Sequence, residues 1–282
     1  MNFPLKALST WKVGGLAETV IWPEHEEELS SILKQAQEEG TPARLFGRGS
    51  NVLFPDEGLS GITLISTSLN NVVWGKERVK VGAGYSLARL AQEAGERELS
   101  GLEFARGIPG TVGGAVVMNA GAHGGEIQNI LEQVRILSFV GELKTLNKEE
   151  IQFGYRECSL RGKAWVLEAH FQLRKGEGEQ IQQIMRESLS KRKTTQPLEF
   201  PNAGSVFRNP PGDSAGRLIE QAGWKGKGIG GAQVSSKHAN FIVNLGNATA
   251  HDVLNLIHEI QDDIYHKFGV ELKTEVQYIA PN

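Results

Sequence analysis

The sequence predicts an α+β fold built in three parts. Residues near the N-terminus alternate strand, helix and strand, which is typical of a small βαβ unit. The middle of the chain changes to two-residue alternation around glycine turns, which indicates β-hairpins. The composition shifts around 176–200, where a helix is followed by a basic connection punctuated by prolines, and a block that mixes helices and strands comes after it. We expect parts at 1–65, 66–176 and 177–270, with 271–282 returning as a strand to the first part.

Local patterns place elements in the first two parts. Residues 26–39 carry apolar side chains at helical spacing, and Gly40 follows as a stop between strands at 18–23 and 43–47. Hairpins are expected around Gly75–Lys76 and Gly141–Glu142. Between these hairpins, a short helix over 86–94 is expected to end before Gly95.

The last part begins with a helix whose inward side chains are expected to be Ile181, Ile184, Met185 and Leu189. A short helix over 214–223 follows. An amphipathic helix over 252–268 has Thr249 as the start of a capping box and Gly269 as its stop. The chain then ends on a strand.

Charge, apolar runs and cysteine content exclude several classes of protein. The formal net charge is −3, and lysines and arginines are mixed with acids, so we expect no nucleic-acid partner. No window approaches the roughly 18 uninterrupted apolar residues of a membrane span, so no membrane partner is expected. One cysteine, Cys158, allows neither an intramolecular disulfide nor a cysteine-rich metal site. We expect a cytoplasmic protein without a metal, as a monomer or a weak oligomer.

Glycine is in excess: 34 of the 282 residues, where a typical usage of about 7% would give roughly 20. The motif GKGIGG at 226–231 matches a dinucleotide-binding pattern, but a helix precedes it and a strand follows, which is the wrong order. The stretches GRGSNVLF (47–54) and GIPGTVGGAVVMNAGAHGGE (107–126) are more informative. The first predicts an anion-binding nest lined by Ser50 and Asn51, or an ordinary turn. The second predicts either backbone packed against a flat phosphorylated ligand or a tight crossing in the core.

Ser205, in PNAGSVFRNP, has several interpretations. The pattern lacks the G-x-S-x-G turn of a hydrolase nucleophile, and Pro210 and Pro211 forbid the helix that a cap would need. A structural hydroxyl and a catalytic proton donor remain, and local chemistry favours the structural one. By the same reasoning Arg156 is a surface arginine or a carboxylate clamp, Glu275 is an edge charge, and His238 is a structural histidine.

Taken together, GRGSN, the 107–126 stretch, GYRECSL, PNAGSVFRNP, AGRLIEQAGWKGKGIGGAQVSSKHANFIVN and LKTEVQYI resemble the UDP-N-acetylenolpyruvoylglucosamine reductase family. The resemblance runs collinearly from about Thr10 to the C-terminus. It implies a vanillyl-alcohol-oxidase-type architecture, in which a small βαβ subdomain and a larger α+β subdomain hold FAD and a third α+β domain binds the substrate. The short spacing between GYRECSL and PNAGSVF resembles the compact subclass.

The resemblance also implies an activity. The family reduces UDP-N-acetylglucosamine enolpyruvate to UDP-N-acetylmuramate for peptidoglycan synthesis. NADPH reduces FAD, and flavin N5 gives hydride to the enolpyruvyl β-carbon. Ser205 would then protonate the α-carbon, while Arg156 and Glu275 would stabilise the charge on the adjoining carboxylate.

By position in the matching motifs, the resemblance assigns two further sets of residues. The FAD set is Gly47, Arg48, Gly49, Ser50, Asn51, Gly110, Thr111, Gly113, Gly114, Ala115, Asn119 and Gly121. The UDP-sugar set is Tyr155, Arg192, Lys193, Gln196, Asn209, Lys237 and His238. The rival interpretations are a flavin oxidoreductase with another substrate, a binding module without catalysis and a serine hydrolase.

Overall fold

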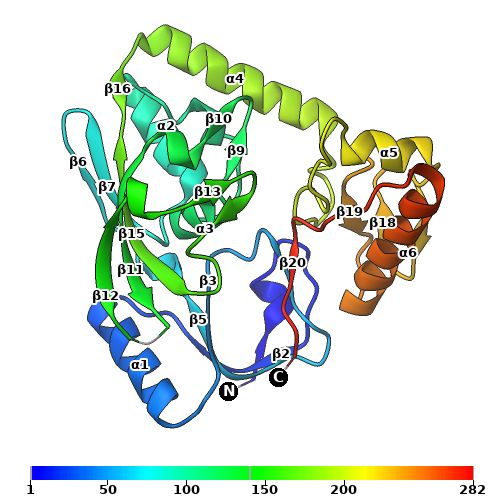
Figure 1. Cartoon of the computed structure of the whole chain (residues 1–282), viewed down its shortest axis with the longest axis horizontal. Coiled ribbons are helices and arrows are strands. Elements are labelled where there is room, and N and C mark those ends of the chain that lie inside the picture. The colour runs from blue at the N-terminus through cyan, green and yellow to red at the C-terminus, as the bar shows by residue number, and fades with distance from the viewer. Residues whose placement is uncertain (1, 140, 282) are drawn as a thin grey trace. The chain divides into compact units, whose positions relative to one another are not determined.

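The computed structural model describes residues 2–139 and 141–281 and has the α+β fold that the sequence predicts (Figure 1). Its contacts define two compact units. The terminal unit consists of Met1–Thr19, Gly49–Ser60 and Lys193–Asn282, and the central unit consists of Val20–Arg48 and Gly61–Arg192. The chain passes between them within β2 (Leu16–Ile21), β5 (Leu59–Ile65) and α4 (Gly178–Thr195) and after Arg48. The division into three parts stays a prediction.

A five-stranded antiparallel sheet is the framework of the central unit. Its strand order is β12-β11-β15-β7-β6. Both predicted hairpins are confirmed, because β6 pairs with β7 and β11 pairs with β12. The strands are β6 (Val72–Trp74), β7 (Arg78–Gly82), β11 (Leu131–Ser138), β12 (Leu143–Asn147) and β15 (Ala164–Gln172).

The two faces of this sheet are covered by different helices. Successive residues of a strand point to opposite faces, and Val166 and Leu167 on β15 illustrate this. Val166 lies in the apolar cluster that contains the buried residues of α2 (Leu87–Glu96) and α3 (Val112–Val117). Leu167 packs in a separate cluster with Leu29 and Leu33 of α1 (Glu26–Glu38). The sheet is therefore buried on both sides.

The remaining strands of the central unit form small sheets outside the five-stranded one. β3 (Ala43–Phe46) pairs in parallel with β5, and β5 lies between the two strands of the predicted βαβ unit, in the order β1-β2-β5-β3. Three short antiparallel pairs join β8 (Leu99–Ser100) to β16 (Arg174–Lys175), β9 (Gly121–Ala122) to β10 (Gly125–Glu126), and β13 (Phe153–Gly154) to β14 (Glu157–Cys158).

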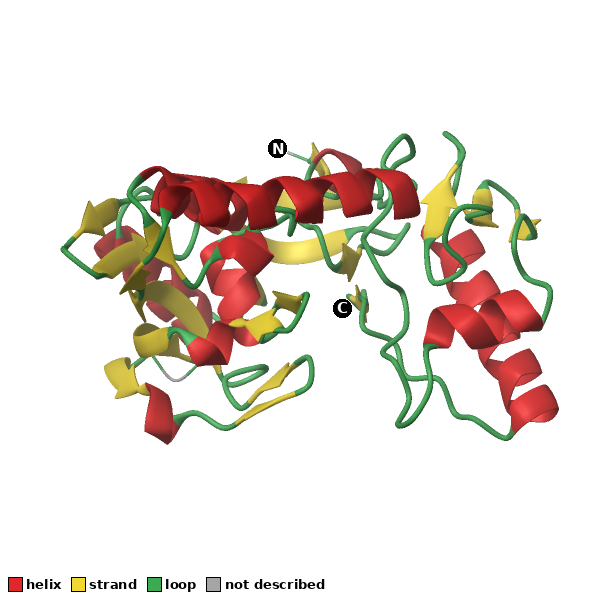
Figure 2. Cartoon of the chain, turned by 90° about the horizontal axis from the view of Figure 1, so that it is seen from above, coloured by secondary structure: helices red, strands yellow, loops and turns green. Residues whose placement is uncertain are grey.

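Two helix predictions need correction. Gly95 does not stop α2, which continues to Glu96, because Gly95 is buried against α4: a Cβ there would lie 3.0 Å from Met185 Cε. Helix α4 is a single unbroken helix (Figure 2). It buries Ile181 and Met185, whereas Ile184 is 44% exposed, so the predicted inward face is too wide. Leu189, also predicted inward, is 37% exposed.

The terminal unit pairs a small sheet with two helices, and α5 packs against α6 (Figure 2). The predicted capping box of Thr249 and Asp252 and the left-handed Gly269 stop of α6 are confirmed. The last strand returns to β4 in parallel, and β1 pairs with β2. The bounds are α5 (Ala215–Gln221), α6 (Ala250–Phe268), β1 (Phe3–Pro4), β4 (Val52–Leu53), β17 (Gly228–Ile229), β18 (Ala232–Val234), β19 (Ile242–Asn244) and β20 (Gln277–Tyr278).

The GKGIGG motif is a structural turn. It contains β17 and leads into β18, the strand that the sequence predicts after it, and it packs against the start of α6. Asp252 Oδ2 accepts a hydrogen bond from Gly231 N at 3.2 Å. Gly230 has φ +53°, and a Cβ there would lie 2.3 Å from Asp252 Oδ1. Close approach to a helix cap therefore explains these glycines without a nucleotide.

The N-terminal segment is fastened to the core of the terminal unit by Trp11. This side chain is fully buried, and its Nε1–H donates to Ile242 O at 2.8 Å. In return, Asn244 Nδ2 donates to Trp11 O at 3.0 Å.

Among residues 2–139 and 141–281, no helix is both long and apolar enough to cross a membrane.

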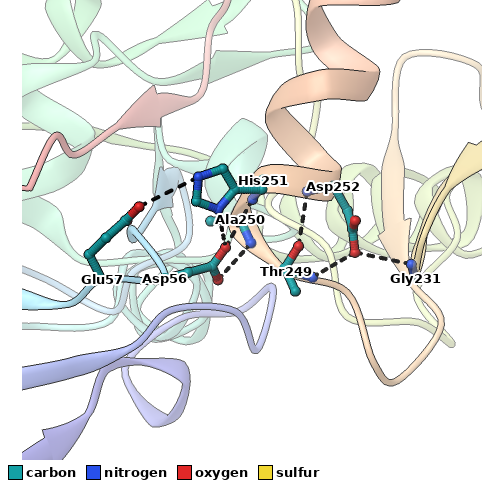
Figure 3. Close-up of polar contacts among 7 residues, drawn as sticks. All are labelled: Asp56, Glu57, Gly231, Thr249, Ala250, His251 and Asp252. Carbon is teal, nitrogen blue, oxygen red and sulfur yellow. Dashed lines mark hydrogen bonds and ion pairs between the residues drawn. The ribbon is translucent and has the colours of Figure 1, made fainter.

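Asp56 fastens the segment that follows β4 to the start of α6 (Figure 3). Its carboxylate accepts hydrogen bonds from Ala250 N at 2.8 Å and His251 N at 3.0 Å. His251 Nδ1 lies 2.8 Å from Asp56 Oδ2, and Nε2 lies 3.5 Å from Glu57 Oε1. A carboxylate at this end of a helix satisfies amides that have no partner within the helix.

Replacing Trp11 tests the fastening of the N-terminal segment. Trp11→Phe leaves Ile242 O without its donor in the core, so we expect the free energy of unfolding to fall by about 2 kcal/mol. Equilibrium urea unfolding measures this change. Trp22→Phe, at a residue that is 38% exposed, is the control and should change it by less than about 0.5 kcal/mol. Equal losses in both variants would contradict the assignment.

The Asp56–His251 contact predicts a pH window of stability. The hydrogen bond to Asp56 raises the pKa of His251 above 6.5. The stability that protonated His251 contributes to the fold is therefore present at low pH and is lost as pH rises through the folded-state pKa. Burial opposes ionisation of Asp56, but the amides of α6 and His251 outweigh it and lower its pKa below 3.8, so its contribution is lost in acid.

The stabilising contributions of His251 and Asp56 are therefore both fully present between the ordinary pKa values of the two groups, 3.8 for Asp56 and 6.5 for His251. Thermal unfolding of His251→Asn should show its largest deficit in Tm near about pH 5.5 and a smaller one near about pH 8. His258→Gln, at an exposed histidine of the same helix, provides the control. A deficit that grows with rising pH would contradict the contact.

Candidate active site

A buried asparagine holds the extended segment that contains Ser205. Asn240 O accepts a hydrogen bond from Val206 N at 2.9 Å. The Asn240 side chain accepts from Phe207 N at 2.9 Å and donates to Phe207 O at 2.8 Å. Val206 and Phe207 are buried, Ser205 is half-buried, and no helix follows it, which confirms that Ser205 is not a helix cap. The sequence analysis missed Asn240, although an asparagine before the apolar run FIV was a signal.

Glu275 lies on the segment next to Ser205. Its backbone N–H donates to Val206 O at 2.7 Å, and Phe207 and Thr274 form an antiparallel bridge. Glu275 is half-buried, so it is less accessible than the fully exposed side chains of the chain. Two motifs that are about 70 residues apart in sequence therefore meet within the terminal unit.

Asn51 contacts the same segment. Its Nδ2 donates to Glu275 O at 3.1 Å, and its backbone O accepts from Gln277 N at 3.0 Å. The parallel pairing of β4 with β20 explains this contact, since it aligns Val52 with Gln277. The glycine loop at 47–51 is thus linked to Glu275.

The two glycine loops predicted from the sequence meet within the central unit. A Cβ at Gly47 would lie 2.4 Å from Thr111 Oγ1, so the close approach requires glycine. Thr111 is the N-cap of α3 and accepts a hydrogen bond from Gly114 N at 3.4 Å. Gly114 is exposed, and a Cβ there would meet only Thr111 Oγ1, at 3.6 Å, within 4 Å. Bare backbone is therefore available to a flat ligand where the loops meet.

Part of the second loop is a tight crossing in the core. The sequence analysis did not predict α3, because its glycines hide the helical pattern. Val112 N donates to Tyr85 O at 2.9 Å, and Gly113 N donates to Ala83 O at 2.8 Å. A Cβ at Gly113 would lie 2.8 Å from Ala83 Cβ. The packing alternative thus explains Gly113, whose amide and Cα face the protein.

The remaining residues predicted to bind FAD have different surroundings. Gly49 has φ +61° and packs on the backbone of Leu8, where a Cβ would lie 2.0 Å from the carbonyl oxygen. Ser50 is half-buried, Arg48 is exposed, and Ala115 is buried in α3. Gly110 has φ +114° and precedes the Thr111 cap.

Arg156 lies in the turn between β13 and β14, with φ +57°. One guanidinium N–H donates to Gly121 O at 2.6 Å, and the guanidinium carbon lies 5.2 Å from the centroid of the Tyr155 ring. Arginine rarely adopts this left-handed backbone conformation, and such outliers gather at functional sites. The contact links the arginine to the second glycine loop, at Gly121.

Apart from Tyr155, the residues predicted to bind the UDP-sugar are spread along the end of α4 and the loops of the terminal unit. Arg192 is half-buried with its Cδ 3.2 Å from the Cβ position of Gly107, and burial lowers its pKa. Lys237 Nζ donates to Lys193 O at 2.8 Å and lies 3.8 Å from Glu199 Oε2. Gln196 follows the end of the helix and is half-buried.

Two of these residues have structural partners. Asn209 Oδ1 accepts a hydrogen bond from Ala215 N, at the start of α5, at 3.1 Å. His238 Nδ1 accepts from Asn240 N at 3.2 Å, and its ring lies 4.7 Å from that of Phe241. Burial lowers the pKa of His238, and the positive charge of Lys225 adds to this. The geometry therefore supports the structural interpretation of His238.

The predicted site residues divide between the units. Asn51, Ser205 and Glu275 come together in the terminal unit, and Gly47, Thr111, Asn119, Gly121, Tyr155 and Arg156 gather in the central unit.

Two protein families match successive segments of the chain. Residues 17–147 match a family described as an FAD binding domain. Residues 196–279 match the C-terminal domain of UDP-N-acetylenolpyruvoylglucosamine reductase.

Full-length relatives agree with these domains. The UDP-N-acetylenolpyruvoylglucosamine reductase of Shouchella clausii is 48% identical over 94% of this chain and 86% of its own length. Reductase 2 of Symbiobacterium thermophilum is 46% identical over 99% of this chain and 91% of its own. The crystal structure of the Thermus caldophilus reductase has a TM-score of 0.86 at 39% identity, covering 99% and 98% of the two chains. The chain belongs to the UDP-N-acetylenolpyruvoylglucosamine reductase family.

Proposed function

We propose that this chain reduces UDP-N-acetylglucosamine enolpyruvate to UDP-N-acetylmuramate, a peptidoglycan precursor, with FAD as its cofactor and NADPH as the reductant. The observation that carries the proposal is the 2.7 Å hydrogen bond from Glu275 N to Val206 O. It holds an acid and a serine from two distant motifs on adjacent segments, as this chemistry requires. The family membership supports the choice of substrate.

FAD suits the residues of the two glycine loops. The exposed Gly114 beside the Gly47–Thr111 contact leaves an uncovered surface for a flat ring system, and Arg48 adds a positive charge. Bound FAD supplies a hydride to the β-carbon of the enolpyruvyl group once NADPH has reduced it. Gly49, Ser50, Asn51, Gly110 and Ala115 would complete the binding loops, whereas Gly113 supports them by its packing on Ala83.

Arg156 would stabilise the charge that appears during the reaction. Hydride addition to the β-carbon sends negative charge to the α-carbon and into the adjoining carboxylate. A guanidinium with fixed orientation stabilises that charge without rearrangement during the step. Arg156 has such a fixed position, because Gly121 O binds one of its N–H groups. Glu275 would contribute as a hydrogen-bonded acid on the same carboxylate.

Ser205 would then deliver a proton to the α-carbon. A serine hydroxyl is a weak acid, but the carbon that it protonates is strongly basic. The two backbone partners of Val206, Asn240 O and Glu275 N, fix the segment at one side of the serine. This preorganisation favours a proton donor over a mobile surface hydroxyl.

The UDP group would be bound by the positive side chains near the end of α4. Arg192, Lys193 and Lys237 carry the charges that a diphosphate needs, and Gln196 and Asn209 offer amide groups. His238 would remain neutral near pH 7, because burial lowers its pKa, so we assign it to support of Asn240. Tyr155 would pack on the substrate beside Arg156.

We further propose that the enzyme works in the cytoplasm as a monomer or a weak oligomer. Cys158 is the single cysteine of the chain and is buried, which suits a reducing compartment. NADPH and nucleotide sugars are also small molecules of that compartment.

Ser205→Ala tests the proton donor. We expect flavin reduction by NADPH at the parent rate and a fall of about 10²- to 10⁴-fold in turnover of the enolpyruvyl substrate. Stopped-flow absorbance of the flavin separates the two half-reactions. Ser31→Ala, at an exposed serine of α1, is the matched control, and Ser205→Cys should recover part of the rate. Normal turnover in Ser205→Ala would exclude the proposed role.

Arg156→Lys tests the carboxylate clamp. The substitution keeps the charge but loses the planar fork of donors, so kcat/KM for the enolpyruvyl substrate should fall about 10- to 100-fold. Arg156→Ala should lose about 10²- to 10³-fold. Arg174→Ala, at an exposed arginine of the same unit, should keep the parent value. A loss confined to the NADPH half-reaction would contradict the assignment.

A further inference from the structure

We propose that Asn119 is a positioning residue for Arg156: its side-chain amide ties the β13–β14 turn to the second glycine loop and thereby sets the place of the guanidinium. The proposal rests on the function proposed for Arg156. It reassigns Asn119, which the sequence predicts as a residue that touches FAD. All of the residues involved lie in the central unit.

The Asn119 amide makes hydrogen bonds with both of its groups. Nδ2 donates to Gly154 O and to Glu126 Oε2, each at 3.0 Å, and Oδ1 accepts from Gln128 N at 3.1 Å. A primary amide has two N–H donors, so both are used. Asn119 is also fully buried, with 0% of its surface exposed. These bonds leave the side chain no N–H for a flavin and point to a structural link.

The link reaches Arg156 by a short covalent path and by a second contact. Gly154 is the last residue of β13, and Tyr155 and Arg156 form the turn that follows it. On the other side, Gly121 O accepts from the Arg156 guanidinium at 2.6 Å. Both the backbone before the turn and the end of the arginine are thus held by residues 119–121.

Glu126 closes the network. It pairs with Gly121 in the β9–β10 ladder, so one residue anchors the strand whose carbonyl binds Arg156. Its carboxylate also accepts from Asn119 Nδ2 and from the Gln128 side chain. A Cβ at Gly121 would lie 2.6 Å from Gly125 O, which leaves this strand little freedom to shift.

The backbone conformations explain why an asparagine is suited to this place. Asn119 has φ +40° and Arg156 has φ +57°. Asparagine tolerates the left-handed region better than most residues, whereas arginine does so poorly. Holding Arg156 there requires surrounding contacts that outweigh the strain. The amide of Asn119 provides two such contacts through Gly154 and Glu126.

The test compares Asn119→Gly, Asn119→Asp and Arg156→Ala in the flavin-loaded enzyme. Glycine removes the amide without strain at φ +40°, and aspartate keeps the size but loses the donors to Gly154 O and Glu126. Glu98→Gly is the matched control, because Glu98 is an exposed residue of the same unit with φ +57°. The measurements are flavin content, the rates of the two half-reactions and hydrogen exchange of the 153–158 amides.

We expect flavin content and the NADPH half-reaction to stay within about twofold of the parent. Reoxidation of the flavin by the enolpyruvyl substrate should slow about 10- to 100-fold in both Asn119 variants, because a small displacement of the Arg156 guanidinium weakens its contact with the reacting group. Exchange of the 153–158 amides should rise in these variants and not in Glu98→Gly. The double variant Asn119→Gly/Arg156→Ala should be no slower than Arg156→Ala, because Asn119 acts through the arginine.

Three results would overturn the positioning role. These are parent-like reoxidation in Asn119→Gly, losses that multiply in the double variant, and loss of flavin without faster exchange at 153–158, which indicates direct contact with the cofactor. A different result, a parent-like rate in Arg156→Ala, would refute the proposed function of Arg156. In that event, hydrogen exchange of the 153–158 amides alone decides whether Asn119 holds the β13–β14 turn.

Discussion

Buried backbone groups must be hydrogen-bonded, and in this protein asparagine side chains meet that constraint where the candidate site leaves regular secondary structure. Asn240 pairs with both backbone groups of Phe207, beside Ser205. Asn244 bonds the backbone of Trp11 and so holds the N-terminal segment. Asn119 bonds Gly154, before Arg156. A side-chain amide has a donor and an acceptor, as a peptide does, so it can extend hydrogen bonding into irregular segments without a strand or helix.

The residues that stabilise the fold are different from the residues proposed to act in catalysis. The apolar clusters on both faces of the five-stranded sheet, and the cluster around α6, stabilise the units without using any proposed catalytic side chain. The proposed catalytic residues instead lie on turns and extended segments attached to those frameworks. Strain at Arg156 and close glycine contacts at Gly47 can persist because the packed framework around them is rigid.

Much of the fold could be predicted from short-range patterns. The capping box at Thr249 and Asp252, the left-handed Gly269 stop and both hairpins of the sheet depend on neighbours in sequence, and each is confirmed. The exceptions depend on distant contacts. Gly95 continues α2 because Met185 of another helix packs on it, and α3 forms in a glycine-rich stretch because Tyr85 and Ala83 accept its first amides. Propensity alone cannot include such partners.

The sequence by itself determined the class of fold, the two glycine loops and the family, because these depend on periodicity and on motifs that are contiguous in the chain. Only the tertiary structure decided that Ser205 and Glu275 lie on adjacent segments, that Glu275 is half-buried, and that His238 accepts a hydrogen bond from Asn240 N. It also decided that Asn119 bonds Gly154 across 35 residues of chain. Hydrogen-bond partners of this kind are set by strand pairing and packing between distant segments, which no local pattern encodes.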